Sequence, residues 1–428
     1  LFSEKDYRTP SNSKVISALQ GLMCDKDFCT LYSLFMLALA RKELSTCSFR
    51  LFVGENPNLS QPIEDLSTKV TEEDLNEAIT DEFGVKYSKD GRKLLKAPYE
   101  LDSTYSIKEG VKIICERAFF CCGSLSSLVI PDSVTRIGNG AFNGCYYLQK
   151  LEIPDGVTRL GEGVFEGCSS LGSLVIPDSV TSIEDRVFND CHSLKNLVIP
   201  DGVTSIGEDA FASCESLKSL VIPASVVNIK GDPFYCWTGK LRCLSPYFIY
   251  EDNVLFDRDK STIISFRDIK ATSYTIPDSV TSIGERAFCY CESLTSLVIP
   301  DSVASIGDGA FEGCESLKNL VIPDNITSIG KGVFQGCSSL TDIVIPNRVT
   351  SIGEGAFFAC NSLTSIVIPS SVICIGTWAF YGCESLKSLV IPDSVTSIGD
   401  ETFYGCCFPN DLKQELISRF GNRIFVKP

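Results

Sequence analysis

Cysteine is the side chain whose number most suggests chemistry, because this chain of 428 residues contains 21 cysteines and a single histidine. Eleven cysteines recur at one position of a repeated motif, and we call them the ladder cysteines: Cys122, Cys145, Cys168, Cys191, Cys214, Cys291, Cys314, Cys337, Cys360, Cys383 and Cys406. Cysteines that recur once per repeat of a long chain are expected to stack in the core, where a thiol packs as a small hydrophobic group. We therefore expect the ladder cysteines to be reduced and unreactive in the folded protein.

Neither metal nor catalytic chemistry is predicted. Zinc requires four ligands that converge on one point, which a linear row of thiols does not supply. His192 lies at a variable position of the repeat, and a catalytic base also needs a nucleophile and an orienting group beside it. The sequence thus predicts no enzyme activity, no metal and no cofactor. Five cysteines outside the ladder could pair as disulfides, and their redox state stays open: Cys24, Cys29, Cys47, Cys236 and Cys243.

Carboxylates form a second regular row. An aspartate follows the repeat proline at Asp132, Asp155, Asp178, Asp201, Asp278, Asp301, Asp324 and Asp393. Stacking of the repeats would place these side chains about 5 Å apart. Calcium could bridge such a row, but it needs six to eight oxygen ligands and the repeat supplies few others. We favour the alternative in which each aspartate bonds its own turn and faces water.

These rows exist because the chain is an internal repeat. The motif Leu-x-x-Leu-x-Ile-Pro recurs every 23 residues from Leu125 to Leu217 and again from Leu294 to Leu386, which is a leucine-rich-repeat period. Within a unit, apolar residues alternate with polar ones as in a strand with one buried face. The pattern predicts an α/β leucine-rich-repeat solenoid with short strands on the concave face and short helical or 3-10 segments opposite.

A longer period organises the whole chain, since Val85 and Tyr87 match Val254 and Phe256 at an offset of 169 residues. Each half begins with the signal of a hairpin. We divide the repeat region into a first array at 85–230, an irregular bulge at 231–253, a second array at 254–407 and a C-terminal cap at 408–428. We expect one right-handed solenoid through both halves, which requires the strands at Ile222 and Ile276 to share a sheet.

The ends of such an array need caps, because the terminal coils expose the core. At the C-terminus, Asn410 or Asp411 could N-cap a helix that carries Leu412, Leu416, Ile417 and Phe420 and stops at Gly421. Residues 1–84 lack the repeat, and we predict a small, mainly helical region there. Its candidate helices are Val15 to Leu22, Leu31 to Ala40, and a segment after the capping pair Thr71 and Asp74 that would carry Leu75, Ile79 and Phe83.

The composition of the chain disfavours some classes of binding partner. The net charge of -16 disfavours nucleic acid and anionic lipid, which are held mainly by clustered lysine and arginine. The longest apolar stretch, near residues 28–40, is shorter than the roughly 20 residues of a membrane span. We expect no nucleic-acid partner and no membrane insertion, and we find no export signal at the start of the chain.

A family resemblance follows from these motifs. The run Ile-Pro-Asp-Ser-Val-x-Ser-Ile-Gly, followed by Ala-Phe and Gly-Cys, as at Ile299 to Cys314, closely resembles the BspA-like leucine-rich-repeat family of bacterial surface proteins. The resemblance covers about residues 85–407. It implies a solenoid at or outside the cell surface that adheres to host proteins or other cells, without enzymatic activity. Without a visible export signal, a cytoplasmic location stays open.

The candidate contact face follows from strand alternation. The residue between the buried leucine and isoleucine of each strand faces outward, which gives a row of valines flanked by polar side chains. These residues are Val129, Val175, Val198, Val221, Val298, Val321, Val344, Val367, Val390, Asn196, Asn319 and Asp342. A shallow apolar surface with a polar rim suits a protein partner. Two functions remain open, a protein-binding or adhesion module that uses this face and a structural scaffold that associates with itself.

Overall fold

The structure, a computed structural model, describes residues 67–426. The predicted helices at Val15 to Leu22 and Leu31 to Ala40 lie outside the described residues. Helices are few within the described range: α4 (Glu72–Asn76), α5 (Asn410–Phe420) and the 3-10 helix η2 (Asn422–Ile424). The predicted α/β solenoid is therefore built mostly of strands and turns.

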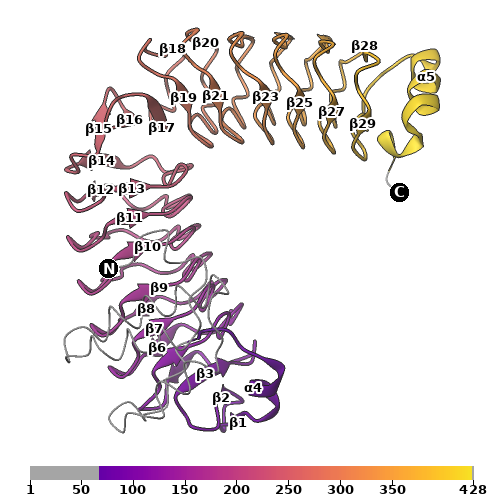
Figure 1. Ribbon diagram of the computed structural model, residues 1–428. Coiled ribbons are helices and arrows are strands. Elements are labelled where there is room, and N and C mark those ends of the chain that lie inside the picture. The colour runs from indigo at the N-terminus through magenta and orange to yellow at the C-terminus, as the bar shows by residue number, and fades with distance from the viewer. Residues whose placement is uncertain (1–66, 427–428) are drawn as a thin grey trace, which may run out of the picture. The chain divides into compact units, whose positions relative to one another are not determined.

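Each coil contributes short parallel strands to two ladders, which lie on two of its three sides and are clearest for β20 to β29 in Figure 1. The first ladder holds the strands of the predicted contact face, which we call the valine strands: β4 (Thr104–Ser106), β6 (Ser127–Val129), β8 (Lys150–Leu151), β12 (Ser219–Ile222), β14 (Lys240–Cys243), β18 (Ser273–Thr275), β20 (Ser296–Val298), β22 (Asn319–Val321), β24 (Asp342–Val344), β26 (Ser365–Val367) and β28 (Ser388–Val390).

The second ladder holds the isoleucine strands, most of which end on a buried isoleucine: β5 (Ile113–Ile114), β7 (Arg136–Ile137), β9 (Arg159–Leu160), β10 (Ser182–Ile183), β11 (Ser205–Ile206), β13 (Asn228–Ile229), β19 (Ser282–Ile283), β21 (Ser305–Ile306), β23 (Ser328–Ile329), β25 (Ser351–Ile352), β27 (Cys374–Ile375) and β29 (Ser397–Ile398). A glycine follows several of these strands because the coils approach closely there. A Cβ on Gly353 would lie 2.6 Å from the carbonyl carbon of Gly330.

The third side of each coil is a series of turns, and the predicted short helical segments are absent from the described coils. Gly140 and Gly144 have φ of 57° and 73°, values that a right-handed helix does not allow. Alternate N–H groups donate to the next coil instead, as from Phe142 to the carbonyl of Val164 at 2.9 Å. The turns thus form a third set of hydrogen bonds between coils.

Aromatic rings and thiols fill the core between the ladders. Phe142 and Phe165 stack with ring centroids 5.6 Å apart, and Phe357 stacks on Phe380 at 5.2 Å. Such offset stacks stabilise a core beyond the burial of their area. Trp237 takes the place of the ladder cysteine in the last coil of the first array, and its indole N–H donates to the carbonyl of Leu217.

The prediction of one sheet through both halves is wrong. The strand β12, which ends at Ile222, pairs with β14, whereas β18, just before Ile276, begins a separate six-stranded sheet. Between them lie β15 (Phe248–Glu251), β16 (Val254–Asp257) and β17 (Thr262–Phe266), which form antiparallel pairs. The segment predicted as an irregular bulge, residues 231–253, thus contains β15 and also β14, which pairs in parallel with β12 and forms part of the last coil of the first array.

The antiparallel strands of the junction divide the hydrophobic core. Leu255 and Ile264 pack in the core of the first array, whereas Val254 and Phe256 pack in the core of the second. Alternate residues of a strand face opposite ways. A strand that is buried on both faces therefore separates the two cores.

The N-terminal end of the first array is covered by a short segment. β1 (Ile79–Thr80), β2 (Lys86–Tyr87) and β3 (Lys93–Lys96) begin the first sheet. The predicted capping pair is confirmed, since Thr71 and Asp74 form a reciprocal capping box at α4. However, α4 ends at Asn76, and Ile79 lies in β1, so the longer helix predicted here is wrong. Val70, Leu75 and Ala78 pack against Leu95 and its neighbours.

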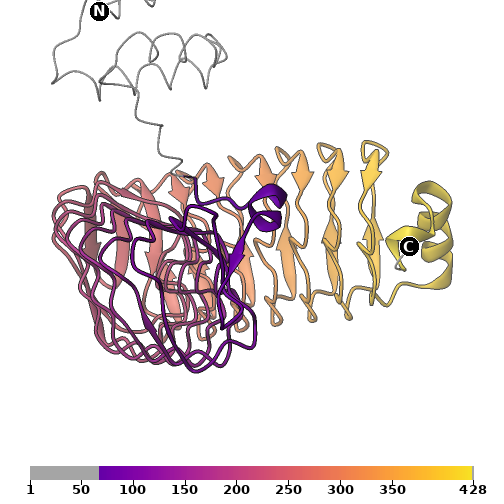
Figure 2. The same ribbon diagram turned by 90° about the horizontal axis from the view of Figure 1, so that it is seen from below.

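The C-terminal cap is the helix α5, seen at the end of the coils in Figure 2. Leu416 is buried against the second core, and Leu412 and Phe420 pack beside it. Gly421 ends the helix with φ of 84°, as predicted. The N-cap residue is Pro409 and makes no side-chain bond, so the predicted cap by Asn410 or Asp411 is wrong.

Candidate binding face

The predicted outward valines are all exposed. Their exposed fractions range from 40% for Val221 to 79% for Val321, whereas Leu320 and Ile322 on either side of Val321 are 5% and 4% exposed. Alternation of exposed and buried residues follows from the two faces of a strand. The valines of the set are Val129, Val175, Val198, Val221, Val298, Val321, Val344, Val367 and Val390.

Strand register makes this face most regular in the second array. Val321 pairs with Val344, Val344 with Val367, and Val367 with Val390 in parallel strands. We call these four residues the valine row. In the first array the row is less regular, because Glu152 interrupts it and Val221 is paired with Arg242.

Polar side chains flank the valine row in the same register. Asn319 and Asp342 pair directly across β22 and β24, and both are exposed. In the first array, Asn196 pairs with Ser173 through an isolated bridge. The structure therefore brings Asn319 and Asp342 beside the regular valine row, whereas Asn196 flanks the less regular part.

Charged side chains mark both margins of the face in the second array. Lys318 and Lys387 come directly before β22 and β28, and Asp324 and Asp393 come three residues after these strands end. All four are exposed. Because the strands are parallel, the lysines share one margin and the aspartates share the other.

The aspartate row offers no metal site within residues 67–426, where no group of three or more candidate ligands occurs. The turn after each proline is closed by the backbone, as by the Val134 N–H and the Pro131 carbonyl at 3.0 Å. The neighbouring Ser133 hydroxyl donates to the carbonyl of Val111 in the preceding coil. These bonds leave the Asp132 carboxylate exposed to water.

The ladder cysteines are buried free thiols, and most of them donate to the carbonyl of the repeat phenylalanine in the preceding coil. The distance from Sγ to the oxygen is 3.2 Å for Cys337 and Phe311. Burial raises the pKa of Cys168, Cys214 and Cys383 to about 12 and raises the pKa of Cys337 well above its usual value. These thiols are therefore protonated at neutral pH and do not act as nucleophiles.

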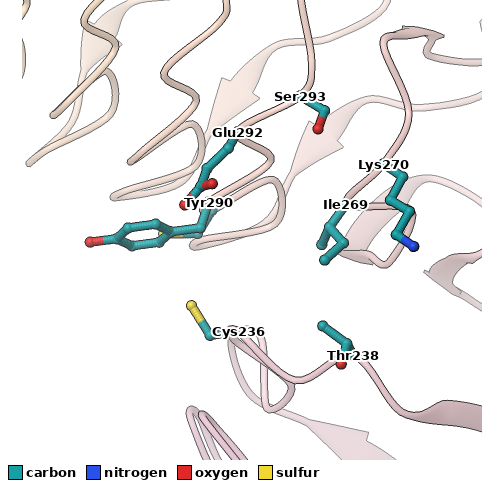
Figure 3. A pocket seen from close by; sticks show the side chains of 8 residues that line it. Cys236, Thr238, Ile269, Lys270, Tyr290, Glu292 and Ser293 are labelled. Carbon is teal, nitrogen blue, oxygen red and sulfur yellow. The ribbon is translucent and has the colours of Figure 1, made fainter. Parts of the chain in front are cut away.

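A pocket of about 260 Å³ opens where the two arrays meet. In Figure 3, Cys236 and Thr238 from the end of the first array face Tyr290 and Glu292 from the second. Cys236 and Cys243 are both free thiols, and burial raises the pKa of each. Cys24, Cys29 and Cys47 lie outside the described residues.

His192 makes structural contacts. Its Nδ1 lies 3.0 Å from the carbonyl oxygen of Ser213 and 3.7 Å from a carboxylate oxygen of Glu215. Because the carbonyl only accepts, Nδ1 carries the proton in this contact. The arrangement ties adjacent coils and presents no nucleophile to the ring.

Sequence reasoning missed the buried polar contact that joins the arrays. The Arg267 guanidinium donates to the carbonyls of Phe234, Trp237 and Gly239 and lies 4.5 Å from the centre of the Trp237 ring. Burial raises the pKa of the nearby Asp232 carboxyl to about 7, and the positive charge of Arg267 offsets part of that rise in pKa. The duplication shows only that Arg267 is specific to the second half, since the residue 169 positions before it is Pro98, and it does not indicate the partners of this arginine.

The repeat motif identifies the family. The sequence matches the family described as BspA type leucine rich repeat region (6 copies) at residues 112–238, 264–372 and 350–427, which is more than half of the chain. The protein therefore belongs to this leucine-rich-repeat family. No curated protein matches the sequence.

Solved structures of bacterial proteins share the fold. A leucine rich cell surface protein from Faecalibacterium prausnitzii A2-165 is 29% identical, with a TM-score of 0.60 over 81% of this chain and 98% of that chain. The pneumococcal vaccine antigen PcpA is 19% identical, with a TM-score of 0.51 over 82% of this chain and 98% of that chain. Among residues 67–426, no helix has the length and apolar character needed to cross a membrane.

Proposed function

We propose that this protein is a non-catalytic protein-binding or adhesion solenoid, displayed at the cell surface or secreted, and that its valine strands form the contact face. The observation that carries the proposal is the in-register valine row from Val321 to Val390, exposed in every strand. A contiguous exposed apolar surface with a polar rim is typical of protein interaction sites. The description of the Faecalibacterium protein as a cell surface protein supports the location.

Strand propensity alone is a weaker explanation for the valines. The isoleucine strands of the same coils also pair in parallel, yet they carry serine beside the buried isoleucine, as in Ser328 and Ser351. The ladder therefore forms without exposed valine. Exposed valine recurs in strand after strand of the valine ladder, whereas the isoleucine side has only scattered exposed apolar residues such as Val227 and Ile373. A partner that contacts the valine strands explains this difference better.

Charged substitutions on the face test this proposal. Val321→Glu with Val344→Glu should leave the free energy of unfolding within about 1 kcal/mol, because exposed positions tolerate substitution. Binding should fall at least about tenfold, since contact would desolvate two carboxylates. The measurement is fluorescence of the labelled full chain on an array of purified extracellular and bacterial surface proteins.

The matched control is Ser328→Glu with Ser351→Glu, which adds the same charge to the isoleucine strands of the same two coils. This control variant should give the same fluorescence signals on the protein array as the unmodified chain. If the valine variant folds and keeps every signal, the contact face is elsewhere.

A further inference from the structure

The charges on the two margins of the valine row follow a rule. Three coils of the second array carry a charge just before or at the start of the valine strand and another six residues later: Lys318 and Asp324, Asp342 and Arg348, and Lys387 and Asp393. In each coil the two charges have opposite sign. The sign reverses on both margins together at the coil of Val344.

These charges are largely free to meet a partner. All six side chains belong to exposed residues. Within the described part of the chain, Lys318, Asp324, Asp342 and Arg348 form no ion pair with another residue, and Asp393 lies 3.8 Å from Arg419 while remaining fully exposed. Opposite charges held apart on one face and unpaired there favour a partner with the complementary pattern.

The partner that carries this pattern is a second copy of the same face. A two-fold axis parallel to the row of valines turns one copy to face the other, exchanges the two margins and keeps each coil at its own level. Lys318 then meets Asp324 of the second copy, and Asp342 meets Arg348. A two-fold axis along the strands would instead place the lysine margin of one copy against the lysine margin of the other, so that like charges would face each other.

We propose that the valine row is a homophilic contact, in which two copies of this chain pair face to face about a two-fold axis parallel to the row. The inference rests on the proposed function, since it names the partner of the same face. Valine then packs on valine at the centre and the opposite charges close the margins, as in an isologous interface.

The area available fits a weak and reversible pair. Six strands at about 4.8 Å spacing, with about seven residues across each at about 3.3 Å, give roughly 600 Å² per copy. The total of about 1,200 Å² is at the lower end for specific interfaces. Many copies of an adhesive protein on one surface bind with an avidity that exceeds the affinity of a single contact, so each contact can be weak.

Charge reversal tests the pairing. One variant of the full chain carries Lys318→Asp and Lys387→Asp, and the other carries Asp324→Lys and Asp393→Lys. Each variant then has like charges facing at these two coils, and self-association measured by sedimentation should weaken at least about tenfold. An equimolar mixture should form a heterodimer, because each margin of one variant complements the other. Rescue in the mixture also shows that both variants are folded.

Two controls sharpen the measurement. Lys318→Asp and Asp324→Lys alone leave Asp393 and its contact with the cap helix intact, so they repeat the test if the double variants unfold. Glu354→Lys makes the same charge reversal at the turns, where it breaks only an exposed pair with Lys331. It should self-associate like the unmodified protein.

Three results would overturn the proposal: a chain that stays monomeric at about 200 µM, well above the micromolar range of weak specific contacts, dimers that persist unchanged in both reversed variants, or a mixture without heterodimer. The proposed function is judged separately. The reversed variants keep all four valines, so array signals that survive in them support contact with a different protein through the valine row.

Discussion

The ladder thiols show how one residue type serves a whole fold. The Cys337 thiol fills a small core position and also satisfies the carbonyl of Phe311, which a purely apolar side chain of that size would leave without this bond. The same carbonyl also accepts from the Cys314 N–H at 3.2 Å, so the thiol supplies the second hydrogen bond of this oxygen. The repeat can therefore stack cysteines without using their redox chemistry.

Thiol labelling tests this role at the scale of the residue. At pH 8 we expect Cys374 and Cys407, which are exposed, to react with iodoacetamide at once. Cys337 should react only after unfolding, because burial holds it protonated and excludes the reagent. Peptide mass spectrometry of the folded protein gives both rates, and equal rates at Cys337 and Cys374 would contradict the account.

The junction is where element-scale packing departs from the repeat. Its strands β16 and β17 are buried on both faces, and Arg267, directly after β17, donates to the carbonyls at the end of the first array. The buried Asp232 accompanies this arginine, with Asp209 and Ser265 nearby. The sequence cannot reveal this contact, because it depends on which coil ends meet in space.

Asp232 should make the stability of the junction depend on pH. Its pKa of about 7 in the folded protein exceeds the usual value near 4. The stability that the protonated carboxyl contributes is therefore fully present below about pH 4 and is lost as the pH rises through 7. As the pH rises from 4 to 8, the free energy of unfolding of Asp232→Asn should increase by roughly 2–4 kcal/mol relative to that of the unmodified chain. Urea unfolding at each pH measures this difference. Parallel pH profiles for the two proteins would show that Asp232 stays ionised.

At the scale of the whole molecule, the resemblance of the repeat motif indicated the family, and the period of 23 residues was enough to predict the coil, the buried cysteines and the exposed valines. Each follows from alternation in a short strand and from stacking of equal units. The turns in place of helices were not predicted, because residues such as Arg186 and Asp190 adopt positive φ without being glycine. The separate sheets depend on how β16 divides its two faces between two cores.

The central claim is that the valine strands, and not the isoleucine strands, meet a protein. One coil offers both positions, because Val344 lies in β24 and Ser351 lies in β25. The most direct measurement places the photo-reactive residue p-benzoylphenylalanine at one position or the other in the full chain, irradiates cells that display it, and identifies adducts by mass spectrometry. The account predicts adducts from position 344 and few from position 351. Equal yields from both positions, or adducts from position 351 alone, would contradict it.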